Sequence, residues 1–276
     1  MVSIENLKFN YGKHVVFNNI NLNLERGKIY GLLGQNGVGK TTLLKILSGL
    51  LKVNNGECSV NGHNPFNREP QFLESVFFVP EDFIAPDKEV NIYAKMRGEF
   101  YPGYDSNKFG RLMTEFEVNG NFKFNKLSYG QQKKALIAFA LSTNTSLILL
   151  DEPSNGLDIP SKSQLRKVIS EASTDNSCIV ISTHQVRDLE NLIDPIIILD
   201  KNGVLLNESI ERITQKLIFS FKNLPDNKAL YNEATPGGYI SVYKNETGAE
   251  TKVNIEALFN TTLMNRNLVS ELFNNI

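Results

Sequence analysis

The sequence has no tryptophan and only two cysteines, Cys58 and Cys178, neither of which forms a CxxC pair or has a histidine at metal-ligand spacing. We expect both to be buried, reduced thiols. The sequence also lacks an excess of either charge, since 29 Lys and Arg face 30 Asp and Glu and leave a formal net charge of -1. Proteins that coat nucleic acid or anionic lipid carry a basic excess, so we expect no nucleic-acid partner.

Long hydrophobic runs are missing as well. The apolar stretches at 147–150 and 196–199 are each followed by an aspartate and are far shorter than the ~20 residues of a membrane-spanning helix. Residues 1–9 alternate polar and apolar side chains, unlike the basic start and apolar stretch of a secretory signal. These absences predict a cytosolic protein. Its 276 residues, 41% hydrophobic and 21% charged, suit one large globular domain with an appendage.

The order of the strand-like and helical stretches predicts an α/β fold. Strand-like stretches at 3–9, 20–24 and 57–60, separated by turn residues, predict a small antiparallel layer at the N-terminus. From Lys28 onward apolar stretches alternate with helical patterns, which is typical of a mostly parallel sheet with helices on both faces. The strands expected in this sheet are 29–33, 76–79, 147–150 and 179–182.

The remaining segments predict an insertion, a hairpin and a C-terminal unit. Residues from about 86 to 142 read as a helical insertion, and residues 196–206 as a hairpin that turns at Asn202-Gly203. We expect a catalytic domain at 1–215 and a small accessory α+β unit at 216–276. The elements expected in that unit are strands at 217–221 and 239–243 and helices that begin near 255 and 267.

Residues 34–41, with the sequence GQNGVGKT, match the eight-position phosphate loop and lie between an apolar strand and an amphipathic helix at 42–50. Glycines allow the backbone NH groups to turn toward a phosphate, and the helix N-terminus adds a positive dipole. Lys40 is expected to reach the outer phosphates and Thr41 to offer its hydroxyl to Mg²⁺. This loop alone leaves kinases, GTPases and ATPases open. The predicted nucleotide-binding residues here are Gly34, Gln35, Asn36, Gly37, Val38, Gly39, Lys40, Thr41 and Thr42.

Acidic residues and a histidine follow three other predicted strands. Asp151 and Glu152 come after the apolar strand 147–150, at the carboxyl edge where open parallel sheets bind ligands. We expect Asp151 to hold Mg²⁺ through water and Glu152 to take a proton from attacking water. Glu81 and His184 follow strands that end at the same edge, so these groups are predicted to converge on one nucleotide. The other histidines, His14 and His63, are expected to be structural.

The segment Leu127-Ser128-Tyr129-Gly130-Gln131 resembles the LSGGQ signature of the nucleotide-binding subunits of ABC transporters, a signature that other phosphate-loop ATPases lack. The resemblance covers about residues 2–212 and implies a P-loop NTPase fold with a RecA-like sheet. It also implies ATP and Mg²⁺ as cofactors. The positions that match this family, in order, are Tyr11 as the aromatic residue that stacks on adenine, Glu81 at the glutamine loop, 154–158 with Asp158 as the D-loop, and His184 as the switch histidine.

Two residues depart from the family pattern. Glu81 stands where the family usually has glutamine. The resemblance implies that it is a metal residue together with Thr41 and Asp151, and its carboxylate would add a negative charge beside Mg²⁺ and the phosphates. Tyr129 replaces the first glycine of the signature. The phosphate contacts of the family come mainly from the serine and the second glycine, which are retained as Ser128 and Gly130. The resemblance therefore still implies a working signature, with bulk at Tyr129 that affects how two halves close.

The resemblance implies a dimer with two ATP molecules at its interface. Ser128 precedes a helix predicted at 131–141, whose N-terminus is an anion site far in sequence from the phosphate loop. One chain's loop is therefore expected to face the signature of a second ATPase subunit, most simply a copy of itself. ATP would hold the two chains together, and hydrolysis would release them.

The resemblance further implies a separate multi-spanning permease that holds this subunit at the cytoplasmic face of the membrane. Residues 101–105 and 255–259 resemble ATPases that serve ABC-2 type permeases, commonly exporters. The alternative is a soluble single-cassette ABC ATPase that acts in cofactor assembly or another non-transport process. A regulator that does not hydrolyse ATP is disfavoured, because both Glu152 and His184 are present. The aromatic residues Phe83, Phe100, Tyr101 and Tyr104 are predicted to dock the permease, with packing inside the insertion as the alternative.

Overall fold

The computed structural model describes residues 1–201 and 203–274. Its central sheet has the strand order β5-β6-β7-β3-β8-β9. The pairs from β5 to β8 are parallel, and β9 joins the edge antiparallel to β8. This confirms the predicted mostly parallel sheet. The strands are β3 (Lys28–Leu33), β5 (Val76–Val79), β6 (Leu147–Asp151), β7 (Cys178–Thr183), β8 (Ile196–Asp200) and β9 (Gly203–Glu208).

The N-terminal antiparallel layer is also confirmed, with longer strands than predicted. It consists of β1 (Val2–Tyr11), β2 (His14–Leu24) and β4 (Asn55–Val60) in the order β2-β1-β4. The chain turns between the first two strands at Gly12, whose φ angle of 55° suits glycine. The buried side of this layer packs with α1 (Lys40–Leu47) and one face of the central sheet. The layer thereby holds the start of the chain beside the phosphate loop.

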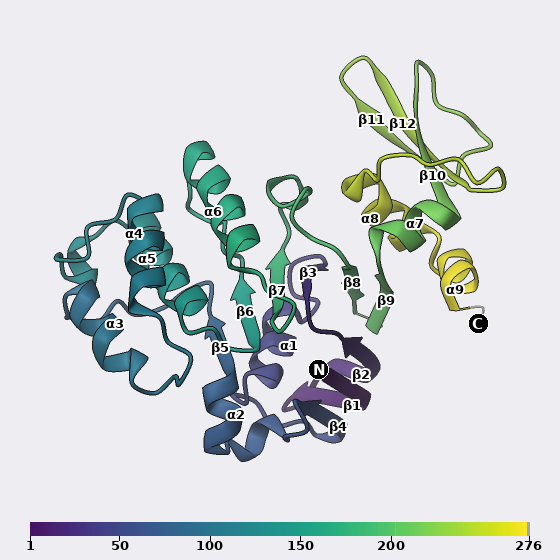
Figure 1. The fold of residues 1–276 in the computed structure, drawn as a ribbon. Coiled ribbons are helices and arrows are strands. Elements are labelled where there is room, and N and C mark those ends of the chain that lie inside the picture. The colour runs from purple at the N-terminus through teal and green to yellow at the C-terminus, as the bar shows by residue number, and fades with distance from the viewer. Residues whose placement is uncertain (202, 275–276) are drawn as a thin grey trace.

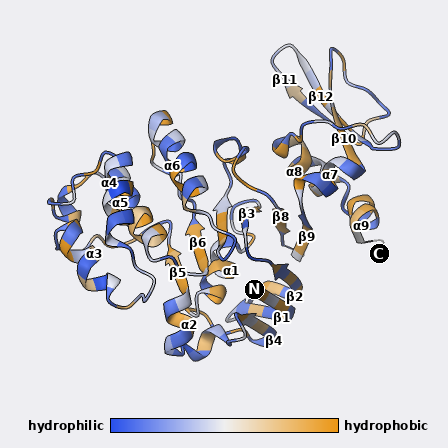
Figure 2. Ribbon diagram, in the orientation of Figure 1, coloured by the Kyte–Doolittle hydropathy of each residue, from blue (hydrophilic) through white to orange (hydrophobic). Residues whose placement is uncertain are grey.

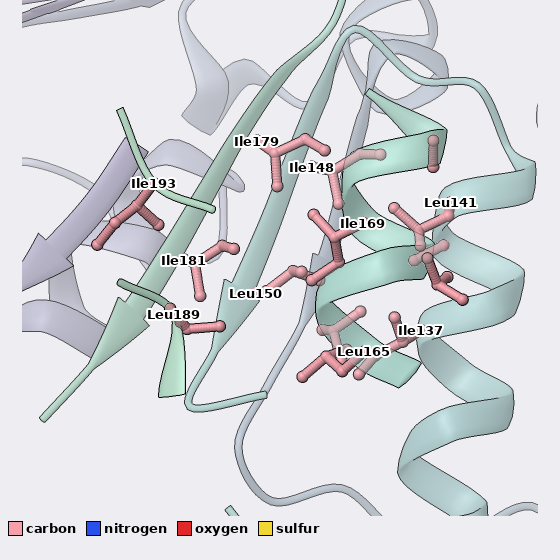
Figure 3. Packing of buried hydrophobic residues seen from close by; sticks show 14 of the residues in the cluster. Ile137, Leu141, Ile148, Leu150, Leu165, Ile169, Ile179, Ile181, Leu189 and Ile193 are labelled. Atoms are coloured by element: carbon pink, nitrogen blue, oxygen red, sulfur yellow. The ribbon is translucent and has the colours of Figure 1, made fainter. Parts of the chain in front are cut away.

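The other face of the central sheet is covered by helices that carry the second hydrophobic core (Figure 3). Ile137 and Leu141 of α5 (Tyr129–Ser142) and Leu165 of α6 (Ile159–Ala172) point toward the sheet. The sheet contributes Ile148 and Ile179, and its strands β5 and β6 are hydrophobic along their length, as the orange colour in Figure 2 shows. Strands with two covered faces read as continuous apolar runs, which is why the sequence predicted them well.

The helices of the segment predicted as an insertion, at about 86–142, lie at the β5 side of the sheet (Figure 1). The buried Phe139 of this segment is surrounded by five aromatic rings at centroid distances of 5.5 to 6.3 Å, among them Tyr101 and Tyr104. These two rings therefore pack the insertion, as the alternative prediction held, whereas Phe100 is 67% exposed. The helices of this segment are α3 (Val90–Gly98), α4 (Ser106–Glu115) and α5, with the 3₁₀ turn η2 (Phe124–Lys126), whereas the 3₁₀ turn η1 (Pro65–Asn67) and α2 (Pro70–Ser75) precede β5.

The C-terminal segment lies beyond β8 and β9, on the opposite side of the sheet from the insertion (Figure 1). Its elements are α7 (Ile210–Lys216), β10 (Leu217–Lys222), β11 (Tyr231–Thr235), β12 (Gly238–Lys244), α8 (Ile255–Met264) and α9 (Arg266–Asn274). The prediction missed β11, which is half-buried along most of its length and so lacks alternation, and α7, which buries only Ile213. The buried apolar residues of the C-terminal segment belong to the same hydrophobic core as one face of the central sheet. Asn202 of the predicted turn lies outside the described residues.

Candidate functional site

A cavity of about 400 Å³ opens where β3 passes through the phosphate loop into α1. Residues from five separate stretches of the sequence meet there, and most of them were predicted. The lining residues are Tyr11, His14, Val16, Asn36, Gly37, Gly39, Lys40, Thr41, Thr42, Glu81, Glu152 and His184. The structure thus brings the predicted adenine, phosphate and acidic residues to one place.

The phosphate loop is already curved around this cavity. Gly37 and Gly39 have φ angles of 81° and 107°, which a side chain would strain, and a Cβ atom at Gly39 would lie 2.7 Å from Phe17. The Nζ atom of Lys40 donates to the carbonyl oxygens of Gly34 at 2.8 Å and Gln35 at 3.3 Å. Burial lowers the pKa of Lys40, and nearby carboxylates, first among them Glu152, act in the opposite direction. The loop therefore presents a cation and backbone NH groups to an anion.

Asp151 ends β6 beside the loop and is 1% exposed. Its Oδ2 atom accepts a hydrogen bond from Thr41 Oγ1 at 2.8 Å, and its Oδ1 atom accepts one from Ser182 Oγ. A hydroxyl and a carboxylate, together with phosphate oxygens, are the ligands that Mg²⁺ takes, so this pair fits the ion. Among the described residues no group of three or more His, Cys, Asp and Glu side chains could hold a metal by itself. The Glu81 carboxylate accepts from Asn155 at 2.7 Å, and its metal role stays a prediction.

Glu152 is held by contacts to both its backbone and its carboxylate. Its φ angle is 44°, in the left-handed region, and its amide donates to both the carbonyl and the hydroxyl oxygen of Ser182 at 3.1 Å. The Oε1 atom lies 2.8 Å from His184 Nδ1 and 3.9 Å from Lys40 Nζ. Glu152 has no basic neighbour in sequence, so the fold alone supplies these cationic and imidazole partners.

The signature lies outside the cavity of its own chain. The helix α5 begins at Tyr129, two residues before the predicted start, because Ser128 and Gln131 form a capping box. In it the Ser128 hydroxyl accepts from the Gln131 amide at 3.3 Å, and the Gln131 side chain accepts from the Ser128 amide at 3.1 Å. Asp158 likewise caps α6 by accepting from the Ser161 amide at 2.9 Å. None of Ser128, Gly130, Gln131 and Asp158 lines the cavity around the phosphate loop.

The two departures from the family pattern contact each other. The hydroxyl of Tyr129 donates to the carbonyl oxygen of Glu81 at 2.6 Å, and its ring lies 6.3 Å from that of Phe83. The start of the signature helix is thus tied to the segment that carries Glu81. The sequence could not show this contact, because the two residues lie in separate elements.

Tyr129→Phe removes this hydrogen bond and keeps the ring. A hydrogen bond in a half-exposed place contributes about 1 kcal/mol, so we expect the free energy of unfolding to fall by about that amount or less in a urea titration. Tyr239→Phe is the control, because the described residues offer its hydroxyl no hydrogen bond. Equal stability of the two variants would show that the Tyr129 contact contributes nothing.

Several residues of the site were not predicted. His14 was expected to be structural, but it lines the cavity, and so does Val16. The sequence feature that could have identified them is their position just after the Tyr11-Gly12 turn. Ser182, which binds both acidic residues, ends the predicted strand 179–182, and no role was predicted for its side chain.

A second cavity of about 590 Å³ adjoins the first along the phosphate loop. Its lining combines 33–36, 183–188 and three residues of α8, namely Glu256, Phe259 and Asn260. Arg187, in the turn η3 (Val186–Asp188), pairs with Glu256 at 2.6 Å. The helix α8 therefore touches the segment that carries His184.

The sequence profile of the ABC transporter family matches residues 17–155, a range that includes the phosphate loop, the signature and both acidic residues. The chain belongs to this family. It is 30% identical over 214 residues to the lantibiotic transport ATP-binding protein SrtF of Streptococcus pyogenes, which covers 76% of this chain and 92% of the relative. Membership confirms the predicted ABC-type ATP-binding and ATP-hydrolysing subunit.

Two further comparisons agree with this ABC subunit. The chain is 31% identical over 205 residues to the bacitracin transport ATP-binding protein BcrA of Bacillus licheniformis, covering 72% of this chain and 66% of the relative. A solved structure of the ATP-binding subunit of an ABC transporter superposes with a TM-score of 0.70 at 23% identity, covering 77% of this chain and 91% of the other. This likeness confirms the predicted P-loop NTPase fold.

Proposed function

We propose that this ABC subunit hydrolyses ATP with Glu152 as general base and drives a membrane transporter. The observation that carries the proposal is the placement of the Glu152 carboxylate 2.8 Å from His184, in the cavity that Lys40 and Thr41 line. A carboxylate held next to the phosphate site can take a proton from a water molecule that attacks the outer phosphate. His184 then fixes the direction of that carboxylate.

Other residues around Glu152 bind the nucleotide and the metal ion in this proposal. Lys40 and the NH groups of the phosphate loop bind the phosphates, and the exposed ring of Tyr11 offers a surface for the adenine. Thr41 and Asp151 would hold Mg²⁺, which neutralises charge on the phosphate oxygens. Ser182 orients both acidic residues through its hydroxyl.

We propose that the working unit is a dimer with two ATP molecules between its chains. Support comes from the position of Ser128, Gly130, Gln131 and Asp158, which lie away from the cavity of their own chain. The N-terminus of α5 is an anion site because its first NH groups point outward along the helix dipole. A second chain would place this end against the phosphates.

We propose that a separate multi-spanning permease binds the helical insertion and holds the subunit at the membrane. Four large apolar side chains of the segment 84–100 are exposed, namely Ile84, Ile92, Met96 and Phe100. Exposed apolar groups of this kind serve as interface anchors. No helix in 1–201 or 203–274 is long and apolar enough to cross the bilayer. Two relatives are named for the transport of lantibiotic and of bacitracin. Because residues 101–105 and 255–259 resemble ATPases that serve ABC-2 type permeases, we propose a permease of that type.

The relatives named for transport do not favour the alternative, a soluble assembly ATPase, and an isolation experiment distinguishes the two. A tagged Glu152→Gln protein can be isolated from detergent-solubilised membranes in the presence of ATP and Mg²⁺. A transporter subunit will bring with it a multi-spanning protein in fixed stoichiometry. Recovery only in the soluble fraction, with a soluble assembly complex, would favour the alternative.

We further propose that residues 1–215 form the catalytic domain and that residues 216–276 are accessory. A chain that ends at 215 is expected to bind a fluorescent ATP analogue within about threefold of the full chain, because the phosphate loop and its partners stay in place. Its melting temperature will be lower, since the apolar contacts of Leu217 and Phe219 with the main core are lost. Loss of ATP binding in a truncated chain that is folded by circular dichroism would contradict this division.

A further inference from the structure

A lysine of the signature helix is completely buried beneath the acidic strand. Lys133 lies one turn into α5 and is 0% exposed. Its Nζ atom donates to the carbonyl oxygen of Glu152 at 2.6 Å and lies 3.4 Å from that of Asn155. The ring of Tyr129 lies 5.5 Å from the same atom. Among the described residues no carboxylate forms an ion pair with it, so the ammonium is satisfied mainly by backbone oxygens.

Burying an ammonium group in this way costs free energy. Desolvation lowers the pKa of Lys133, and the carboxylates of Glu81 and Glu152 oppose that change. A neutral apolar side chain would fill the space at lower cost, as the neighbouring Ala135, Leu136 and Ile137 do along the same helix. A buried cation at this position therefore indicates a specific role. The closest partner of its Nζ atom is the carbonyl oxygen of Glu152.

The backbone of Glu152 needs such a partner. A residue other than glycine with φ in the left-handed region costs of order 1–3 kcal/mol, and it persists only where its surroundings fix it. The amide of Glu152 is fixed by Ser182 on β7, and its carbonyl is fixed by Lys133 on α5. The direction of the Glu152 carboxylate toward His184 depends on both.

We propose that Lys133 is a positioning residue for Glu152, and that it ties the placement of the general base to the signature helix of the same chain. The inference rests on the proposed role of Glu152. Any movement of α5 moves Lys133 and with it the carbonyl of Glu152, so that the base is in place only for one position of the helix. Lys133 itself touches no substrate.

The test is Lys133→Met, which keeps the length and removes the ammonium. We expect kcat for ATP hydrolysis to fall about tenfold, because misplacing a reacting group by ~1 Å costs up to about 10²-fold. KM and the affinity for a fluorescent ATP analogue will stay within twofold, because the phosphate loop is unaffected. If the methionine variant does not fold, Lys133→Gln, which shortens the side chain and removes the charge, serves with the same expected direction.

Lys134→Met is the matched control. Lys134 is the next residue of the same helix and is also buried, at 8% exposed, but its Nζ atom donates to Ser161 Oγ and Gln164 Oε1 on α6. Its loss removes a buried cation without touching Glu152. We expect its kcat to stay within twofold of the unmodified chain.

A double variant separates positioning from general destabilisation. If Lys133 acts through Glu152, adding Lys133→Met to Glu152→Gln will lower single-turnover hydrolysis by less than a further twofold. An equal tenfold loss in both backgrounds, or no loss of kcat in Lys133→Met, would overturn the proposal. Full activity of Glu152→Gln alone would instead refute the role of Glu152, and the two failures are thus distinguishable.

Discussion

Replacing Glu152 with glutamine is expected to lower the turnover of ATP by ~10² to 10⁴, equivalent to about 3 to 5 kcal/mol of barrier. Glutamine has the same shape and can keep the contact with His184, but it cannot accept a proton from water. Binding of ATP will survive, because the phosphate loop and the Thr41–Asp151 pair are unchanged. Steady-state hydrolysis with ATP and Mg²⁺ in excess measures the effect.

The same variant is expected to accumulate as an ATP-held dimer, since closure is retained and the step that opens it is blocked. Light scattering with saturating ATP and Mg²⁺ measures the mass. Glu115→Gln is a suitable control, because this glutamate of α4 pairs with Lys167 of α6 at 2.7 Å and does not line the cavity around the phosphate loop. If Glu152→Gln hydrolyses ATP nearly as fast as the control, Glu152 is not the general base. If it stays monomeric with saturating ATP, the proposed dimer is contradicted.

Replacing Phe139 with alanine is expected to lower the free energy of unfolding by about 3 to 5 kcal/mol. This side chain is 0% exposed, and its ring is the centre of the aromatic cluster formed by Phe77, Tyr93, Tyr101, Tyr104 and Phe109. Truncation leaves a cavity that rigid rings cannot close, and it also removes edge-to-face contacts. Urea unfolding followed by circular dichroism measures the loss.

Phe100→Ala is the control for this cluster, because Phe100 belongs to the same insertion but is 67% exposed. Its substitution is expected to change stability by no more than about 0.5 kcal/mol. If Phe100 helps to bind the permease, the variant will also lose association with the transporter while its ATPase activity is kept. A stability loss equal to that of Phe139→Ala would show that Phe100 is a core residue.

The sequence was most informative for features that depend on a short local segment and not on the surrounding fold. Four apolar residues before Asp151 are typical of a strand covered on both faces, and a chain that alternates such strands with helices predicts a parallel sheet. The phosphate loop works through glycine φ angles and backbone NH groups, which depend on a short local segment. These features predicted the sheet, the loop and the edge at which Glu81, Asp151, Glu152 and His184 meet.

The sequence was least informative where local patterns are weak. The strand β11 has no buried and exposed alternation, because it is the edge strand that pairs with β12 and most of its residues are half-buried. Tyr101 and Tyr104 are aromatic residues of the kind that is common at docking sites, but their rings pack inward against Phe139. Whether an aromatic side chain points inward or outward depends on what the fold places opposite it.

By itself, the sequence determined the strands of the central sheet, the family and the chemical groups of the phosphate site. Only the tertiary structure decided that Tyr129 binds the backbone of Glu81, that Lys133 is buried against the carbonyl of Glu152 and that His14 reaches the cavity. In each case a side chain contacts a backbone atom or lines a cavity that is formed by segments distant in sequence. Their geometry follows from how helices and strands pack, and packing is a property of the whole chain that no local spacing of residues records.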